Sequence, residues 1–376
     1  MKKILVVLLF SALAFGCRSR QTSDNVYFAW VGPLTGSAMQ VGLTQMLAVE
    51  FALEDIMAAG GVLGGRELVV NFFDDQNDLD EAVNIANRIV RSGIYSAVIG
   101  HFASTTSMAA APIYNNAQLI MYSPTASHAD FSSLGEYIFR NTPTQALETA
   151  AYADFVFSNF GIRTVGILNV NDDWGNNITG IFTRAFESLG GSIIISENFQ
   201  AGETRDFSPM LLRMKQENPQ GFFPVAYSSE SAQIIIQMDN LDYNPELTIL
   251  TSSALGQQLL DIAGDLANGA FLMNAFTPDI PGENFARIMQ NYRDRTGGRE
   301  GDHFLMQAYD VVCQLALVID QANSSDPRVM RPVLAAMSDY PALAGPYSMN
   351  EAGDAVRSLQ PIIIENRRFV NVSDRF

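Results

Sequence analysis

Short apolar runs alternate along most of this chain with longer segments in which apolar and polar positions are mixed. Runs of this kind fit buried strands, and the mixed segments fit amphipathic helices. Their regular alternation predicts a doubly wound α/β protein with largely parallel sheets. The expected strands cover 26–31, 67–73, 96–100, 119–122, 164–170, 192–196, 222–225, 247–250 and 269–274, and the expected helices cover 42–59, 79–91, 174–189, 207–216, 229–238 and 304–321.

Three polar or proline-bearing segments divide this pattern, and we interpret them as crossings between two Rossmann-like lobes. They are Asn141-Thr142-Pro143, 277–282 and Gly345-Pro346. A chain of 376 residues is long enough for two such cores. The predicted N-terminal lobe comprises 26–141 and 276–345, and the C-terminal lobe comprises 142–275 and 346–376. Within the second lobe, we expect Ile362-Ile363-Ile364 to form an edge strand.

The first residues have the pattern of a secretory signal. Lys2 and Lys3 precede an apolar run at 4–15, which is shorter than the roughly 20 residues that span a membrane. Cys17 follows Gly16 directly, as in a bacterial lipobox, although Leu13 lies one place further from the cysteine than usual. We therefore expect a signal at 1–16, a lipidated Cys17 and a linker at 17–25. An ordinary secretory signal is the alternative.

Charge and cysteine content narrow the possible partners. The formal net charge is −17, and removal of the signal with Lys2 and Lys3 would make it more negative still. Such a chain repels nucleic acid and anionic lipid, so we expect neither to bind. Cys313 is the only cysteine besides Cys17, and we expect it to be a buried spectator in an apolar helix.

Two hydroxyl-rich loops follow neighbouring predicted strands. His101–Thr106 follows the strand at 96–100, and Ser123–Ser127 follows the strand at 119–122. In a parallel sheet both loops would lie at the carboxyl ends of the strands, where open α/β sheets bind ligands. Each would open a helix and present free N–H groups. We interpret the pair as a cradle for a small carboxylate, although helix capping alone would also explain such residues.

Several segments resemble the type 1 periplasmic binding proteins, in particular the leucine/isoleucine/valine-binding branch. Their order and spacing carry the resemblance over nearly the whole chain from Val26. The segments are Gly32-Pro33-Leu34-Thr35-Gly36, Gly60–Gly65 with Asp74-Asp75, Val98–His101 with Ser104, Ser123-Pro124, Asp206-Phe207-Ser208 and Gln307-Ala308-Tyr309-Asp310.

The resemblance implies a ligand site between the lobes. Its carboxylate-binding residues would be Ser104, Thr125, Ala126 and Ser127, with Thr105 beside them. Trp174, Tyr227 and Phe304 would form aromatic walls. The alternatives are a helix staple for Trp174 and simple packing for Tyr227.

The sequence departs from the family at two positions. Ser253 stands where the branched-chain amino-acid binders have an acid for the ligand ammonium, and Val41 replaces an aromatic residue. A buried ammonium needs a carboxylate partner. Either another acid serves, or the ligand is not a free amino acid. The candidate acids are Asp172, Asp173, Glu230 and Asp310.

The resemblance predicts an extracytoplasmic, membrane-anchored, monomeric protein that captures a small carboxylate by hinge closure and delivers it to the permease of an ABC importer. A sensor on the same scaffold and a binder of an amide or another solute are the alternatives.

Catalytic chemistry is not expected. His101, His128 and His303 lack metal-ligand spacing, and no phosphate loop or nucleophile elbow is present in the sequence. We expect no metal and no cofactor. His101 would fix the geometry of its loop through a ring hydrogen bond.

Overall fold

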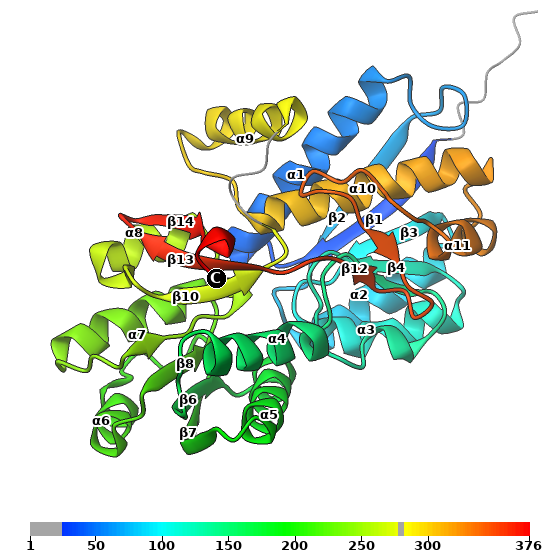
Figure 1. The fold of residues 1–376 in the computed structure, drawn as a ribbon. Helices are drawn as coiled ribbons and strands as arrows, with labels where there is room; N and C mark the ends of the chain where they lie inside the picture. The colour runs from blue at the N-terminus through cyan, green and yellow to red at the C-terminus, as the bar shows by residue number, and fades with distance from the viewer. Residues whose placement is uncertain (1–24, 277–281) are drawn as a thin grey trace, which may run out of the picture.

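The computed structural model describes residues 25–276 and 282–376, which form two α/β lobes side by side (Figure 1). The predicted signal, Cys17, nearly all of the linker and the segment 277–281 of the second crossing lie outside the described residues. Within the described ranges, no helix is both long and apolar enough to span a membrane.

The first lobe is built on a five-stranded parallel sheet in the order β2-β1-β3-β4-β5. Because β4 lies between β3 and β5, the two predicted loops leave neighbouring strands at the same edge. The strands are β1 (Val26–Gly32), β2 (Leu68–Asp74), β3 (Tyr95–Gly100), β4 (Ile120–Ser123) and β5 (Ile138–Arg140).

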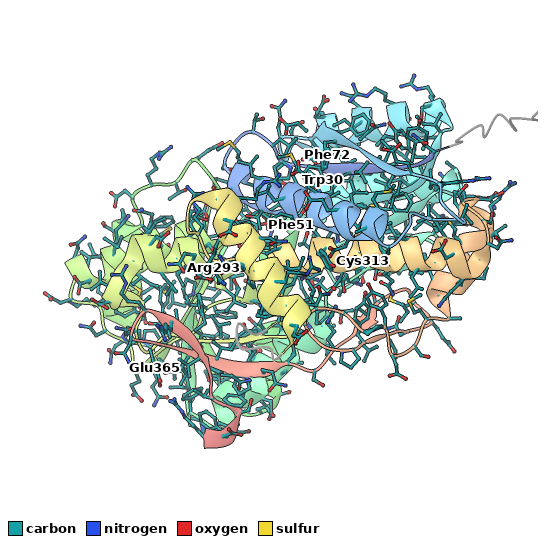
Figure 2. The ribbon with its side chains drawn as sticks, turned by 90° about the horizontal axis from the view of Figure 1, so that it is seen from above. Trp30, Phe51, Phe72, Arg293, Cys313 and Glu365 are labelled. Atoms are coloured by element: carbon teal, nitrogen blue, oxygen red, sulfur yellow. The ribbon has the colours of Figure 1, made fainter. Side chains whose placement is uncertain are left out.

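Helices cover both faces of this sheet. α1 and α10 pack on one face, where Trp30 and Phe51 are buried (Figure 2), and α2 and α3 pack on the other. Cys313 on α10 is half-buried against the first of these cores, and burial raises the pKa of its thiol to about 12. The helices are α1 (Met39–Ala58), α2 (Leu79–Ser92), α3 (Ser104–Asn116), α9 (Glu283–Thr296), α10 (His303–Ala322) and α11 (Pro327–Ala335).

The second lobe combines a parallel sheet, β7-β6-β8-β9, with an antiparallel sheet, β10-β13-β14. A parallel bridge between Ile249 and Phe271 joins the two. The strands are β6 (Thr164–Val170), β7 (Ser192–Phe199), β8 (Gly221–Val225), β9 (Leu247–Thr248), β10 (Phe271–Asn274), β13 (Gln360–Glu365) and β14 (Arg368–Asn371). The helices are α4 (Gln145–Ser158), α5 (Asp173–Ser188), α6 (Ser208–Glu217), α7 (Ser228–Asn240) and α8 (Gln257–Ala263).

Two details of the prediction are wrong. Ile362–Ile364 lies in β13, which pairs with β10 on one side and β14 on the other, so it is not an edge strand. The third crossing does not occur at Gly345-Pro346. Beyond that point β11 (Ser348–Met349) and β12 (Ala355–Val356) still belong to the first lobe, because Met349 and Ala355 are buried in its core.

Candidate ligand-binding site

The two hydroxyl-rich loops converge at the carboxyl edge of the first sheet. The hydroxyl of Ser104 accepts a hydrogen bond from the backbone N–H of His128 at 3.2 Å. Thr125 Oγ1 donates to the carbonyl of Phe102 at 2.7 Å, and Ser123 Oγ donates to the carbonyl of His101 at 2.9 Å. The predicted convergence of the loops is therefore confirmed.

Some of the expected donors serve the loop itself. Ser123 Oγ accepts from the N–H groups of Thr125 at 3.3 Å and Ala126 at 2.9 Å, so these amides stabilise the turn. Ser104 is buried, and its hydroxyl oxygen accepts from the backbone N–H of His128. Neither of the two cavities described below is lined by Ser104, Thr105 or Ala126. Their direct contact with a carboxylate stays a prediction.

A small inner cavity of about 30 Å³ lies between the lobes beside these loops. Polar side chains from both lobes surround it. It is lined by Thr125, Ser127, Thr142, Pro143, Glu148, Ser252, Ser253, Asn274, Ala275, His303, Phe304 and Gln307. Thr125, Ser127, Ser253 and Phe304 are thus brought together as the resemblance implied.

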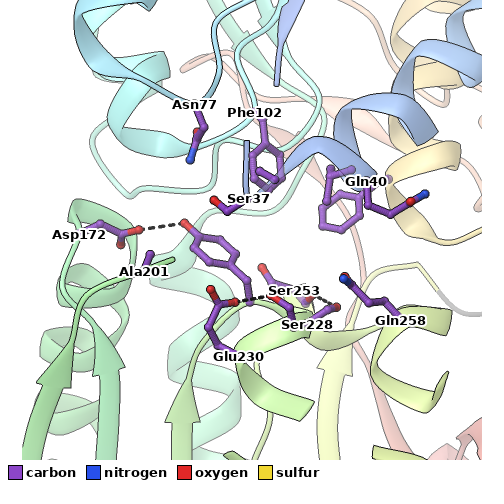
Figure 3. Close-up of a pocket in the computed structure, with 15 residues that line it drawn as sticks. Ser37, Gln40, Asn77, Phe102, Asp172, Ala201, Ser228, Glu230, Ser253 and Gln258 are labelled. Atoms are coloured by element: carbon purple, nitrogen blue, oxygen red, sulfur yellow. Dashed lines mark hydrogen bonds between the residues drawn. The ribbon is translucent and has the colours of Figure 1, made fainter. Parts of the chain in front are cut away.

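An outer cavity of about 80 Å³ adjoins the inner one (Figure 3). Ser253 and Phe304 border both cavities. Val41 lies in the outer lining, as do Tyr227 and Phe102. The remaining residues of this lining are Ser37, Ala38, Gln40, Asn77, Asp172, Ala201, Ser228, Ser229, Glu230 and Gln258.

Aromatic side chains connect the lobes across the outer cavity. Phe102 of the first lobe lies 6.1 Å from Tyr227 of the second and 5.7 Å from Phe304, between ring centroids. Tyr227 stacks on Trp174 at 4.8 Å. Trp174 lines neither cavity and instead supports Tyr227 from behind. Sequence reasoning missed Phe102, whose only signal is its place in the first hydroxyl loop.

The structure shows which of the candidate acids for a ligand ammonium line the cavities. Asp310 is buried inside the first lobe and lines neither cavity; it accepts from the N–H of Leu343 at 2.8 Å and lies 3.6 Å from the Arg357 guanidinium. Asp173 lines neither cavity. Asp172 and Glu230 line the outer one.

Both outer-cavity acids are already engaged. Asp172 caps α5 by accepting from the N–H of Gly175 at 2.7 Å, and it also accepts from the Tyr227 hydroxyl at 2.9 Å. Burial raises the pKa of Asp172, although these hydrogen bonds oppose the change. Glu230 accepts from the Ser229 hydroxyl at 2.7 Å.

Sequence reasoning missed Glu148, which lines the inner cavity. Burial raises the pKa of its carboxyl to about 7, with the nearby Ser252 hydroxyl opposing the shift. His303 lines the same cavity and donates from Nδ1 to the carbonyl of Leu255 at 2.8 Å. Burial lowers the pKa of His303 to about 4, so its ring is neutral at physiological pH. No helix is predicted at 145–158 from the sequence, so no local signal singles out Glu148.

A family model described as periplasmic binding protein matches residues 25–360. The chain belongs to this family. More specifically, it is a type 1 periplasmic binding protein similar to the leucine/isoleucine/valine-binding branch, as the sequence predicted. A leucine-, isoleucine-, valine-, threonine- and alanine-binding protein from Pseudomonas aeruginosa is 26% identical over 352 residues, which cover 92% of each chain.

Solved structures show the same fold. A leucine-binding protein, LivK, from Thermotoga maritima has a TM-score of 0.85 at 23% identity, covering 93% of this chain and 98% of its own. A solute-binding protein from Rhodopseudomonas palustris in complex with 3,4-dihydroxybenzoic acid also has a TM-score of 0.85, at 19% identity, covering 93% of this chain and 96% of its own.

The two hydroxyl-rich loops, His101–Thr106 and Ser123–Ser127, are called the first and second ligand loops below. In this periplasmic binding protein, the first ligand loop is anchored by buried polar contacts. His101 Nδ1 lies 2.7 Å from Asp75 Oδ2, and both side chains are fully buried. Asp75 also accepts from the N–H of Asn77 at 2.9 Å. The predicted ring hydrogen bond of His101 is confirmed. No cluster of three or more His, Cys, Asp or Glu side chains suited to a metal occurs in the described parts of the chain.

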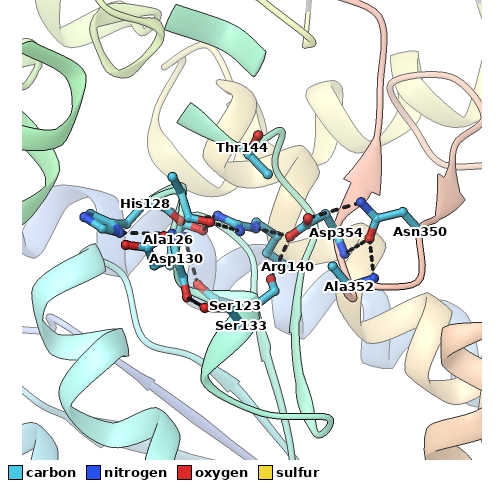
Figure 4. A network of polar contacts seen from close by, with 12 residues as sticks. Ser123, Ala126, His128, Asp130, Ser133, Arg140, Thr144, Asn350, Ala352 and Asp354 are labelled. Atoms are coloured by element: carbon cyan, nitrogen blue, oxygen red, sulfur yellow. Dashed lines mark hydrogen bonds and ion pairs between the residues drawn. The ribbon is translucent and has the colours of Figure 1, made fainter. Parts of the chain in front are cut away.

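The second ligand loop is held by Arg140, which sequence reasoning also missed (Figure 4). Its Nη1 donates to the carbonyls of His128 at 2.6 Å and Ala126 at 3.4 Å, and Nη2 donates to Ala129 at 3.3 Å. Nε pairs with Asp354. The guanidinium thus holds three backbone carbonyls of the turn that carries Ser127.

Proposed function

We propose that this periplasmic binding protein captures a small carboxylate-bearing solute, with an amino acid as the leading candidate, and delivers it to the permease of an ABC importer. The observation that carries the proposal is the position of the inner cavity. First-lobe Thr125 and Ser127 face second-lobe Ser252 and Ser253 across it, so both lobes contribute hydroxyl groups to one small space.

Hinge closure is the mechanism that this arrangement supports. Phe102 and Tyr227 belong to different lobes and pack against each other, so their contact exists only when the lobes are together. A ligand held by both lobes stabilises this closed form relative to an open one. The permease would then read the closed protein.

The ligand class is the part that needs measurement. The Pseudomonas relative is named for amino acids, whereas one structural neighbour holds a dihydroxybenzoic acid. Ser253 and Val41 depart from the amino-acid-binding pattern. The panel must therefore contain amino acids, their amides, short-chain acids and aromatic acids.

Calorimetric titration of the purified protein with this panel tests the proposal. We expect saturable binding of at least one carboxylate and much weaker binding of its amide. Ser127→Ala should weaken the best ligand by about tenfold, because one hydrogen bond to a charged group is lost. Correctly folded protein that binds no member of the panel would contradict the proposal.

We also propose that Cys17 is lipidated and that the protein is a monomer anchored outside the cytoplasm. Mass spectrometry of the mature N-terminal peptide tests the first point, and light scattering of the detergent-free Cys17→Ser protein tests the second. An unmodified Cys17, or cleavage at another residue, would contradict the lipid anchor.

A further inference from the structure

We propose that Glu148 accepts the amino group of the ligand in the inner cavity, together with Gln307 and His303. The protein would thereby select solutes that carry an amino group next to the carboxylate. This inference rests on the proposed solute-binding function and names the substrate class. The negative charge that pairs with the ligand ammonium would then come from α4, and not from the position of Ser253.

Glu148 is buried and has no cationic partner within residues 25–276 and 282–376, as such a role requires. The residue is 9% exposed, and it forms no ion pair with any described residue. A carboxylate that is buried without a cationic partner is destabilised, because it loses hydration without gaining an opposite charge. A ligand ammonium would provide the missing charge and stabilise the ionised form.

Two further acceptors line the same cavity. Gln307 is 3% exposed, and its Oε1 has no hydrogen-bond partner among the described residues. His303 donates from Nδ1 to Leu255, so the second nitrogen of its neutral ring is an acceptor. An ammonium donates three hydrogen bonds. The cavity lining offers it Gln307 Oε1, the second ring nitrogen of His303 and the Glu148 carboxylate, which also accepts from Ser252.

The size of the cavity fits the same group. A volume of about 30 Å³ has room for a small polar group such as an ammonium. The hydroxyls of Ser127 and Thr142 line it as well and can donate to a carboxylate. One end of an α-amino acid can therefore engage hydroxyl donors and the acceptor group together.

The outer acids do not offer this chemistry. Asp172 accepts from Tyr227 and caps its helix, and Glu230 accepts from Ser229, so neither lacks a donor. Both line the outer cavity and not the inner one. Of the cleft carboxyls described here, Glu148 is the one that lines the inner cavity, and it has no cationic partner among the described residues.

Calorimetry with matched ligand pairs tests the inference. Each pair joins an amino acid to the acid that lacks only its amino group: L-leucine with 4-methylpentanoate, L-phenylalanine with 3-phenylpropanoate, and L-alanine with propanoate. For the best pair, we expect the amino acid to bind the unaltered protein at least about tenfold more tightly. Glu148→Gln should reduce that ratio to about threefold or less, while the amino-free acid binds as before.

Asp154→Asn is the matched control, because Asp154 is an exposed carboxylate on the same helix and its loss changes the net charge equally. We expect this variant to keep the full preference for the amino acid. Thermal unfolding of both variants checks that they are folded.

The outcomes separate this inference from the proposed function. Binding of only the amino-free acids, or an unchanged ratio in Glu148→Gln, overturns the role of Glu148 and leaves solute capture intact. An equal loss of preference in Asp154→Asn also overturns it, because a general charge effect would then explain the result. Absence of binding by every member of every pair contradicts both.

Discussion

Arg140 and Asp354 form a buried ion pair across 214 residues of sequence. Arg140 lies on β5 and holds the carbonyls of the second ligand loop, whereas Asp354 lies next to β12 near the end of the chain. Asp354 also accepts from the Ser132 hydroxyl at 2.7 Å and from the Asn350 side chain at 3.2 Å. The last segment of the first lobe therefore helps to shape the ligand site.

Asp354→Ala should destabilise the protein by about 3–5 kcal/mol, because it leaves the buried Arg140 guanidinium without its counter-charge. Urea unfolding measures the change. Ligand affinity should fall too, since Arg140 would no longer hold the loop of Ser127 firmly. The comparison is Glu197→Gln, which breaks the exposed ion pair between Glu197 and Arg213. It should lower the free energy of unfolding by at most about 1 kcal/mol. Similar losses from both substitutions would contradict a special role for the buried pair.

Ser123→Ala should destabilise the second ligand loop. Ser123 Oγ is fully buried and makes three hydrogen bonds, one to His101 and two from the loop amides. Its removal leaves these groups unsatisfied, at a cost of about 2–4 kcal/mol. Unfolding in denaturant reports the loss, with the exposed Ser188→Ala as the comparison. A change below 1 kcal/mol would show that water replaces the hydroxyl without penalty.

Tyr227 should contribute to ligand affinity mainly through its ring. Tyr227→Phe removes the 2.9 Å hydrogen bond to Asp172 but keeps the stack on Trp174, so affinity should fall only about threefold. Tyr227→Ala opens the contact with Phe102 and should weaken binding by about tenfold or more. Calorimetry with the best ligand compares them. Equal effects would assign the role to the hydroxyl.

Glu148 should make the ligand-free protein less stable at high pH. Its folded pKa of about 7 lies above the ordinary value of 4.5, so the folded state binds this proton more tightly than the unfolded state. The resulting stability is complete below about pH 4.5 and is lost as pH rises through 7, for a total of about 3 kcal/mol. Glu148→Gln should therefore match the parent protein near pH 4 and exceed its stability at pH 8.

Urea unfolding of both proteins across this range measures the difference. Taking the difference cancels the contributions of Asp302 and Asp310, whose pKa values burial raises to about 6. A constant difference between pH 4 and pH 8 would contradict the prediction. Added ligand with an amino group should reduce the difference, because its charge favours the ionised Glu148.

The elements that the sequence predicted well are those with a strong local signal. β1 and β3 are continuous apolar runs, and α10 is a long apolar helix, so each was located within a residue or two. The two hydroxyl-rich loops follow β3 and β4. Their convergence needed only the rule that neighbouring parallel strands end at one edge.

The features that escaped prediction depend on contacts between distant residues. No local pattern shows that Asp354 pairs with Arg140, and the crossing at Gly345-Pro346 was placed by a turn signal alone. β14 has exposed ends and only half-buried central residues, so it shows no apolar run, and the sequence alone predicts β13 as the edge strand. The weak apolar periodicity of α4 concealed that helix and, with it, the position of Glu148.

Ser253 and Phe304 line both the inner and the outer cavity and lie at the boundary between them. Under the proposed function, the charged head of a solute would contact the inner lining and its tail the outer lining, so different side chains would recognise the two parts. Substitutions around Val41 or Gln258 would reshape the tail compartment without disturbing Glu148 or Ser127. A lineage could therefore broaden or exchange its nutrients in small steps while each intermediate protein still closes around the same head group.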